Sequence, residues 1–188
     1  MATIQITEQE ALTQEMFSAM LWALSYPGNI QTLPRVGLQA FVAVGETFLD
    51  LETSYYTNNA DLNEYLSPLG ASYASPDRAA YQFYPSVDAF ALHTMADAPC
   101  GTYQSPDHAA TLILGCRIGS GSQLILSGPG IHGTASISVG EIPATFWHLR
   151  QGKLQYPLGW DVYLLDGEEG KLVGLPRTTQ VEVLEWPM

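Results

Sequence analysis

Basic residues are scarce in this chain of 188 residues, which has seven lysines and arginines against 19 acidic residues and a net charge of −12. The seven are scattered singly along the sequence. Proteins that bind nucleic acid or anionic lipid need clustered Lys and Arg, because phosphate neutralisation drives their binding. The composition therefore predicts no nucleic-acid partner and no membrane partner. One well-placed arginine is still enough to bind a single phosphorylated small molecule.

Cysteine, signal sequences and long apolar runs are scarce too. Cys100 and Cys116 have neither metal-binding nor redox spacing, and the four histidines show no i,i+4 pairing, so no metal is expected. The N-terminus lacks the basic start and apolar run of a signal peptide. No stretch approaches the roughly 20 apolar residues of a membrane span. These absences predict a cytoplasmic protein whose two reduced thiols belong to the core.

The sequence also lacks the motifs of self-sufficient catalysis. It has no Gly-x-Ser-x-Gly elbow and no Gly-Lys-Ser/Thr phosphate loop. Gly128–Gly133 has Gly-x-Gly-x-x-Gly spacing, but a strand is expected after it, whereas the dinucleotide-binding fingerprint opens a helix. Lys153 follows Gly152 at a helix end, and Lys171 follows Gly170 in a hairpin. Neither lysine has the desolvated context that Schiff-base chemistry requires. We expect no pyridoxal phosphate or other cofactor, and no catalytic residue is identified.

Apolar residues, by contrast, are abundant. Hydrophobic residues make up 46% of the chain and charged residues only 14%, against a usual charged fraction of about 25%. Such a composition predicts a large core, or a neutral surface of the kind found at the centre of protein interfaces. The length fits a single domain over residues 1–188, and no repeat or linker divides it.

Hydrophobic periodicity predicts a mixture of helices and strands. We expect helices from Thr7 to Tyr26 and over 38–49, 59–66, 87–95 and 143–154. We expect strands over 30–33, 54–57, 78–84, 110–117, 123–127, 131–139, 161–165, 171–175 and 179–184. Ile118–Ser122 has the composition of a hairpin turn. Hairpins dominate the second half, which favours an α/β fold with a mixed sheet flanked by helices over a strict doubly wound fold.

The first helix is predicted to begin with a capping box formed by Thr7 and Glu10. Trp22 falls on its polar side, and an exposed tryptophan there suggests an interface with another protein. The alternative is a wide apolar stripe packed on two sides. The stripe that faces the core is expected to contain the residues that recur at helical spacing, which are Leu12, Met16, Phe17, Met20, Leu21 and Leu24.

Two loops between strands are candidates for an anion site. Ser127–Ile131 contains a Pro-Gly pair typical of a type II turn, whose amides either form an anion nest or make a plain turn. Leu175–Thr179 offers one arginine with two hydroxyls, which either bind a phosphate or leave the arginine in a structural ion pair with Asp161 or Glu182. The candidate residues are Gly128, Gly130, Asp161, Arg177, Thr178 and Thr179.

Five segments resemble the PhnH family of the bacterial carbon–phosphorus (C–P) lyase system. Tyr156–Asp161 followed by Leu175–Thr179 is similar to its C-terminal signature, and Gly128–Ile131 to its glycine-rich turn. Phe17–Gly28 and Ser105–Leu114 are similar to its opening helix and central strand. The segments keep the family's order over most of the chain. Trp160 departs from the pattern, which has a smaller aliphatic residue there.

The resemblance implies properties that the residues alone do not show. It implies a fold similar to the large domain of pyridoxal-phosphate-dependent transferases, without the cofactor. It also implies a homodimer that joins PhnG, PhnI and PhnJ in a core complex. With PhnG, PhnI and PhnL, this subunit is required to transfer the ribose triphosphate moiety of ATP to a phosphonate, with release of adenine. Cleavage of the carbon–phosphorus bond then belongs to PhnJ and its iron–sulfur cluster.

A family member of this kind is a non-catalytic or accessory subunit in alkylphosphonate use, and contact with a phosphonate or nucleotide stays open. The alternative is an independent enzyme or binding protein for a phosphorylated small molecule, which would use the arginine and threonines of the second loop.

Overall fold

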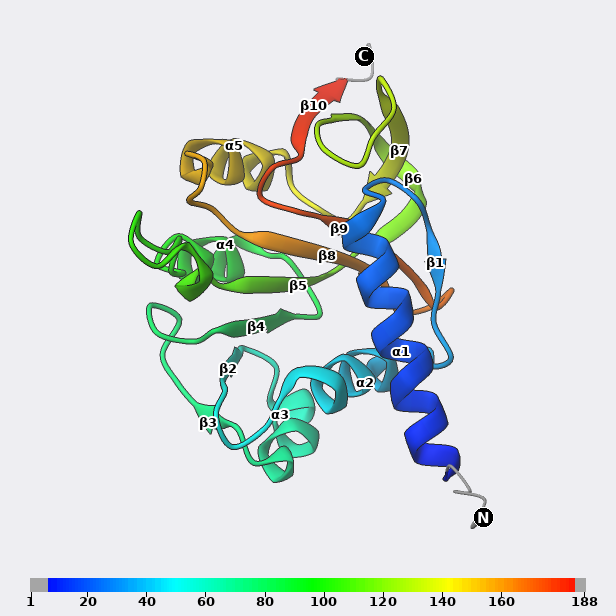
Figure 1. Ribbon diagram of the computed structural model, residues 1–188, viewed down its shortest axis with the longest axis vertical. Helices are drawn as coiled ribbons and strands as arrows, with labels where there is room; N and C mark the ends of the chain where they lie inside the picture. Colours follow the sequence, from blue (N-terminus) through cyan, green and yellow to red (C-terminus); the bar gives the residue numbers. More distant parts are fainter. Residues whose placement is uncertain (1–6, 185–188) are drawn as a thin grey trace, which may run out of the picture.

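The computed structural model describes residues 7–184, and within them the chain forms five α-helices, two short 3-10 helices and ten strands (Figure 1). The helices are α1 (Glu8–Ser25), α2 (Leu38–Phe48), α3 (Ala60–Leu66), α4 (Ala89–Met95) and α5 (Ala144–Lys153). The strands are β1 (Gln31–Thr32), β2 (Ser54–Thr57), β3 (Ser72–Tyr73), β4 (Tyr81–Tyr84), β5 (Thr111–Gly115), β6 (Arg117–Ser127), β7 (Ala135–Gly140), β8 (Asp161–Asp166), β9 (Lys171–Leu175) and β10 (Gln180–Leu184).

Seven strands form a mixed sheet in the order β1-β9-β8-β5-β4-β2-β3. The five strands from β8 to β3 are parallel, whereas β9 pairs antiparallel with β8 and β1 antiparallel with β9. The central strands are almost wholly buried, as expected for parallel strands covered on both faces. The predicted mixed sheet with flanking helices is confirmed.

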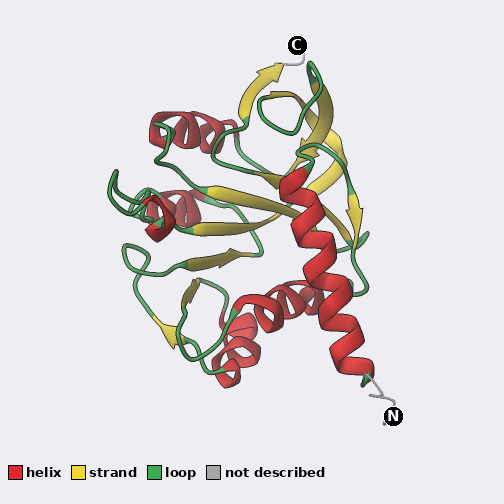
Figure 2. Cartoon of the chain, viewed as in Figure 1, coloured by secondary structure: helices red, strands yellow, loops and turns green. Residues whose placement is uncertain are grey.

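Helices lie on both faces of this sheet (Figure 2), and buried side chains fill the space between them and the sheet. Alternate residues of a strand point to opposite faces, so Phe83 and Ile113 pack with α1 and α2, while Tyr84 and Leu112 pack with α4 and α5. The second face also carries a three-stranded antiparallel sheet in the order β10-β6-β7, which the sequence did not predict as a separate sheet.

The predicted hairpin turn at Ile118–Ser122 is wrong. β6 runs through this segment, and its register with β7 shifts between Ile118 and Ser122, which marks a β-bulge. Gly119 and Gly121 have φ angles of 99° and 84°. These glycines therefore serve a bulge that bends the strand and not a reversal of the chain. The reversal comes after Ser127, so the strand expected from Ile131 begins only at Ala135.

The predicted capping box of α1 is confirmed, whereas the helix expected from residue 87 begins at Ala89. The Thr7 hydroxyl accepts a hydrogen bond from the Glu10 amide at 3.2 Å, and the Glu10 carboxylate accepts one from the Thr7 amide at 2.8 Å. The Asn59 side chain caps α3 by accepting from the Leu62 amide at 2.8 Å. Pro143 is the N-cap of α5 and lies just before its first turn. The short strand β3 was not predicted.

Candidate functional site

Arg177 is held inside the protein by Asp161. The Arg177 Nη2 lies 2.7 Å from Asp161 Oδ2, and the Arg177 backbone amide donates to Asp161 Oδ1 at 2.8 Å. Nη1 donates to the Pro106 carbonyl at 2.5 Å. Of the two alternatives for Arg177, the structure therefore shows the ion pair, and its partner is Asp161. A phosphate could bind this guanidinium only in competition with that carboxylate.

A second arginine, Arg150 of α5, holds the same loop from the other side. Its side chain is buried and donates to the Thr179 carbonyl at 3.1 Å and to the Pro176 carbonyl at 2.8 Å. Burial lowers the pKa of Arg150 to about 10, and Asp161 opposes this shift. Within residues 7–184, Arg150 Nε and the buried Thr179 hydroxyl make no hydrogen bond. Sequence reasoning missed Arg150, although its apolar neighbours Phe146 and Trp147 are a signal of burial.

The glycine-rich turn packs between this loop and the end of α1. The Ile131 amide donates to the Gly128 carbonyl at 3.2 Å, and Gly130 has a φ of 84°, as a type II turn requires. A Cβ atom on Gly128 would lie 2.8 Å from the Thr178 carbonyl oxygen, and one on Gly130 2.6 Å from that of Ser25. The structure thus brings Gly128 to Thr178, while the Arg177 side chain reaches Asp161. The anion-binding role of the turn stays a prediction.

α1 has apolar side chains on two sides. Its buried side consists of Met16, Ala19, Met20 and Ala23, and the small Ala23 lets the helix lie against Gly174 of β9. Trp22 is 50% exposed, which corresponds to the first of its two alternatives, and it stacks on Tyr26 with ring centroids 5.4 Å apart. Phe17 and Leu21 were expected in the buried stripe, but they are 51% and 52% exposed. That expectation is wrong because α1 meets β9 at Ala23, and Phe17 and Leu21 lie on the other side of the helix.

A groove of about 260 Å³ lies beside this exposed side of α1. Its floor includes Tyr81 and Thr111, the first residues of the neighbouring strands β4 and β5, and Phe48 stacks on Tyr81 at 4.9 Å. Neither helix covers these strand ends, because α2 stops at Phe48 and α1 crosses the sheet over β9. The lining residues are Phe17, Met20, Leu21, Leu24, Phe48, Tyr81, Thr111 and Tyr163.

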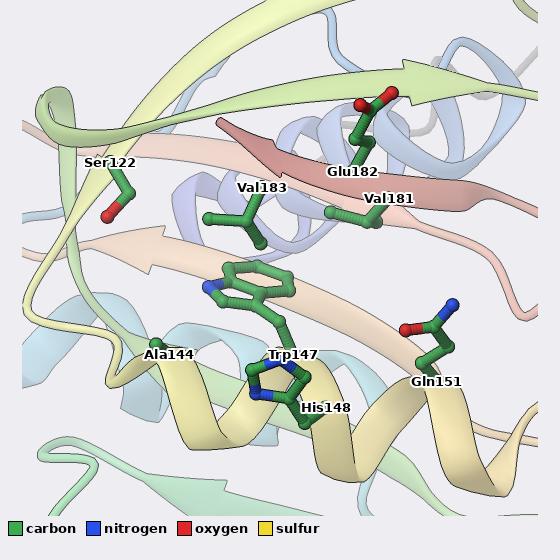
Figure 3. Close-up of a pocket in the computed structure, with 8 residues that line it drawn as sticks. All are labelled: Ser122, Ala144, Trp147, His148, Gln151, Val181, Glu182 and Val183. Carbon is green, nitrogen blue, oxygen red and sulfur yellow. The ribbon is translucent and has the colours of Figure 1, made fainter. Parts of the chain in front are cut away.

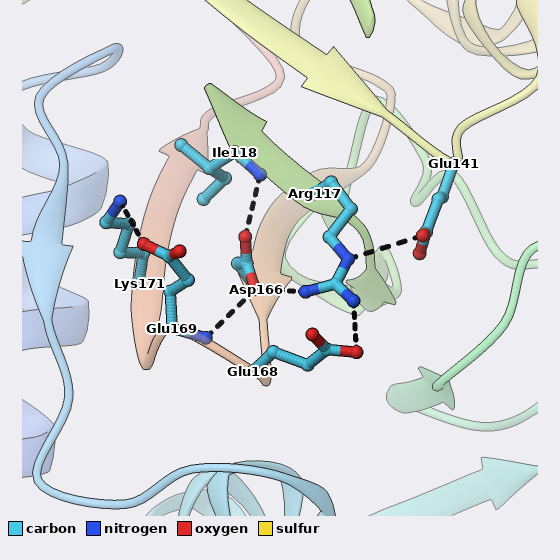
Figure 4. Close-up of polar contacts among 7 residues, drawn as sticks. All are labelled: Arg117, Ile118, Glu141, Asp166, Glu168, Glu169 and Lys171. Carbon is cyan, nitrogen blue, oxygen red and sulfur yellow. Dashed lines mark hydrogen bonds and ion pairs between the residues drawn. The ribbon is translucent and has the colours of Figure 1, made fainter. Parts of the chain in front are cut away.

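A cluster of charges occupies the opposite, carboxyl edge of the parallel strands (Figure 4). The buried Asp166 carboxylate accepts hydrogen bonds from the Ile118 amide at 2.9 Å and the Glu169 amide at 3.1 Å. Arg117 lies 3.7 Å from Asp166, 3.3 Å from Glu141, and also pairs with Glu168. Open α/β sheets bind ligands at this edge. Here Arg117 pairs with three carboxylates and ties β6 to the β8–β9 hairpin.

A further hollow of about 300 Å³ separates α5 from β10 (Figure 3). Trp147, His148 and Gln151 of α5 form one wall, and Val181 and Val183 of β10 form the other. In Figure 3 the indole of Trp147 extends from α5 toward the two valines, so the centre of the hollow is apolar. Sequence reasoning did not identify this hollow, because a helix and a strand more than 25 residues apart form it together.

Metal-binding and membrane-spanning features are absent from the described part of the chain. Over residues 7–184, no group of three or more His, Cys, Asp or Glu side chains is placed to hold a metal ion. In the same range, no helix has the length and apolar character needed to cross a membrane. Burial raises the pKa of the Cys116 thiol, which keeps it protonated at neutral pH.

The family model described as bacterial phosphonate metabolism protein (PhnH) matches residues 5–182 of the 188. The match includes α1, both sheets except the last two residues of β10, and every residue of the candidate anion site. No curated protein matches the chain.

Proposed function

The chain belongs to the PhnH family of bacterial phosphonate metabolism proteins, and on that premise we propose that it serves the C–P lyase system as a subunit that holds its partners in place. In this role it completes no reaction alone.

The exposed side of α1 is the observation that carries this proposal. Phe17, Leu21, Trp22 and Tyr26, which we call the α1 patch, are each about half exposed and follow one another along the helix. Contiguous exposed apolar side chains mark protein–protein contacts, and tryptophan and tyrosine are enriched among the residues that contribute most to binding. A surface of this kind favours docking as the main activity of the subunit.

The engagement of Arg177 supports the same conclusion. Its guanidinium is paired with Asp161 and with the Pro106 carbonyl, so it stabilises the fold. The alternative function, an independent binding protein or enzyme for a phosphorylated small molecule, requires Asp161 to release this arginine. Docking requires no such rearrangement.

The finer features of the proposal come from family membership. We propose a cytoplasmic homodimer, with a single PhnH-like domain over residues 1–188, that joins PhnG, PhnI and PhnJ and acts with PhnL. The reaction it supports transfers the ribose triphosphate moiety of ATP to a phosphonate and releases adenine. The mixed sheet with helices on both faces is compatible with a fold like that of the pyridoxal-phosphate transferases, a likeness that stays a prediction.

Growth on methylphosphonate as the sole phosphorus source tests the proposed function. A bacterium that lacks its own PhnH should regain growth when it expresses this chain, and the chain should co-purify with PhnG, PhnI and PhnJ. The purified chain alone should release no adenine from ATP and methylphosphonate. Release of adenine by the chain alone would contradict the docking role.

A further inference from the structure

Two hollows lie one after the other along α1, and their walls meet at Phe17. A second hollow of about 400 Å³, with Gln9, Thr13 and Thr47 in its walls, shares Phe17 with the first. The α1 residues that line the two are Gln9, Glu10, Thr13, Gln14, Phe17, Met20, Leu21 and Leu24. Steps of three and four place them on one side of the helix. We call the two hollows together the α1–α2 groove; at 1.5 Å per residue it follows α1 for roughly 20 Å.

The centre of the groove suits apolar side chains. Phe17, Leu21 and Leu24 form one wall, and the stacked rings of Phe48 and Tyr81 form part of the floor. A groove of this length and lining is the kind that receives the apolar face of an amphipathic helix, whose contacts recur at i, i+3, i+4 and i+7.

The rim of the groove is acidic. α1 and α2 together contain four glutamates and no lysine or arginine. Glu10 lines the groove, and the Glu46 carboxylate of α2 lies beside it, where it accepts a hydrogen bond from the side-chain Nε2 of Gln9 in α1 at 3.1 Å. Residues 1–77 contain nine acidic residues and one arginine, Arg35, so this part of the chain has a net charge of −8.

The acidic rim indicates which kind of segment the groove binds. A second copy of the chain would bring one acidic rim against another, and like charges held together across an interface are unfavourable. A segment with lysines or arginines beside its apolar face would instead meet carboxylates on both sides of the groove. We propose that the α1–α2 groove binds a basic amphipathic segment of a partner protein, an inference that rests on the proposed docking function.

Reconstitution with PhnG, PhnI and PhnJ tests the location of the contact. The double variant Phe17→Glu/Leu21→Glu places two carboxylates on exposed positions of the groove wall and should weaken association at least about tenfold. Phe90→Glu is the matched control, since Phe90 is 59% exposed on α4, across the sheet from α1. It should associate like the wild type. Circular dichroism and thermal melting should show all three proteins folded.

The charge of the partner is tested by titration at increasing NaCl. Association of the wild type should weaken with salt, because screening reduces the attraction between exposed charges. Glu46→Lys should weaken association at low salt and flatten this dependence. Glu64→Lys makes the same charge change on α3 and serves as the control. It should leave the affinity at low salt and the salt dependence unchanged.

The outcomes separate this inference from the proposed function. If the wild type does not associate with PhnG, PhnI and PhnJ, both the proposed function and the groove proposal are wrong. If the wild type and the double variant associate equally well, the function stands and the groove proposal fails. If the affinity does not change with salt or in Glu46→Lys, the proposal that the bound segment is basic is wrong. Sedimentation that shows the wild type as a dimer and the double variant as a monomer would identify the occupant as a second copy and overturn the proposal.

Discussion

Arg177 and Arg150 fix one loop from two sides, and their surroundings differ. Arg177 has a carboxylate partner, Asp161, and both side chains keep some exposure, 18% and 23%. Arg150 is buried and donates only to backbone carbonyls. Guanidinium groups with several fixed donors suit this task, because each can bind two acceptors at once. The loop between β9 and β10 therefore depends on side chains from α5 and β8.

Replacing Arg177 should destabilise the protein. Arg177→Ala leaves the partly buried Asp161 carboxylate without its ion pair, so the free energy of unfolding should fall by about 2–3 kcal/mol. Urea denaturation measures the change. Arg78→Ala removes an exposed arginine and should stay within about 0.5 kcal/mol of the wild type.

The same variant separates the two roles considered for Arg177. Unchanged stability together with lost growth on methylphosphonate would contradict the structural role and favour ligand binding. Unchanged stability and unchanged growth would reject both.

At the scale of the element, α1 depends on its first turn. The Thr7 hydroxyl satisfies an amide that the helix cannot, so Thr7→Ala should lower the free energy of unfolding by about 1 kcal/mol. Ser18→Ala changes an exposed position in the middle of the helix and should cost nothing, since alanine is the better helix former. Thermal melts of both variants measure this difference. Equal losses would show that the cap has no special role.

The partner of Thr7 makes this contribution depend on pH. Hydrogen bonds from the Thr7 amide and hydroxyl lower the pKa of Glu10 below its ordinary value. Because the folded-state pKa lies below that of the unfolded chain, the stabilisation is present above the unfolded value and is lost as pH falls through the folded one. The stability difference between the wild type and Glu10→Gln should therefore shrink below about pH 4. A difference that grows on acidification would contradict this.

The bulge of β6 should tolerate no side chain at Gly121. A Cβ atom there would lie 2.4 Å from Gly140 Cα, and the φ of 84° already disfavours other residues. Gly121→Ala should lower the free energy of unfolding by more than about 2 kcal/mol. Gly152 lies in α5, where an added Cβ atom would have no neighbour within 4 Å, so Gly152→Ala should be neutral or stabilising. Urea denaturation compares the two.

The elements that depend on local pattern could be predicted from the sequence. Thr7, Asn59 and the strand Ser54–Thr57 each give their signal within a few residues, and the structure confirms them. Gly119 and Gly121 led to the wrong prediction of a hairpin turn, because glycines with positive φ angles occur in turns and in bulges. Only the pairing of β6 with β7 distinguishes the two. The ion pair of Arg177 was one of two alternatives, whereas Arg150 and the groove were missed because contacts between distant segments create them.

For the whole molecule, the net charge of −12 destabilises the folded state, because like charges repel one another in a compact chain. The acidic rim of the α1–α2 groove is one part of an excess that lies mainly in residues 1–77. In dilute buffer these carboxylates repel one another at distances that salt screens, since the Debye length falls from about 30 Å at 0.01 M to about 10 Å at 0.1 M. The folded state brings them closer together than the unfolded chain does.

Salt should therefore stabilise the isolated protein. Its melting temperature should rise when NaCl increases from about 0.01 M to about 0.1 M, because screening relieves repulsion in the folded state more than in the unfolded chain. Differential scanning calorimetry measures the shift, and KCl should reproduce it if screening is the cause. A fall in melting temperature would mean that ion pairs such as Asp161–Arg177 outweigh the repulsion.

The close approach of Ala23 to Gly174 has a consequence for recognition. A side chain at residue 174 would push α1 away from β9, so this glycine determines where the outer side of the helix lies. A partner protein would bind a surface that is already ordered, so this protein would lose little conformational entropy on binding. The rate and the specificity of assembly would then depend on how easily the partner adopts its bound conformation.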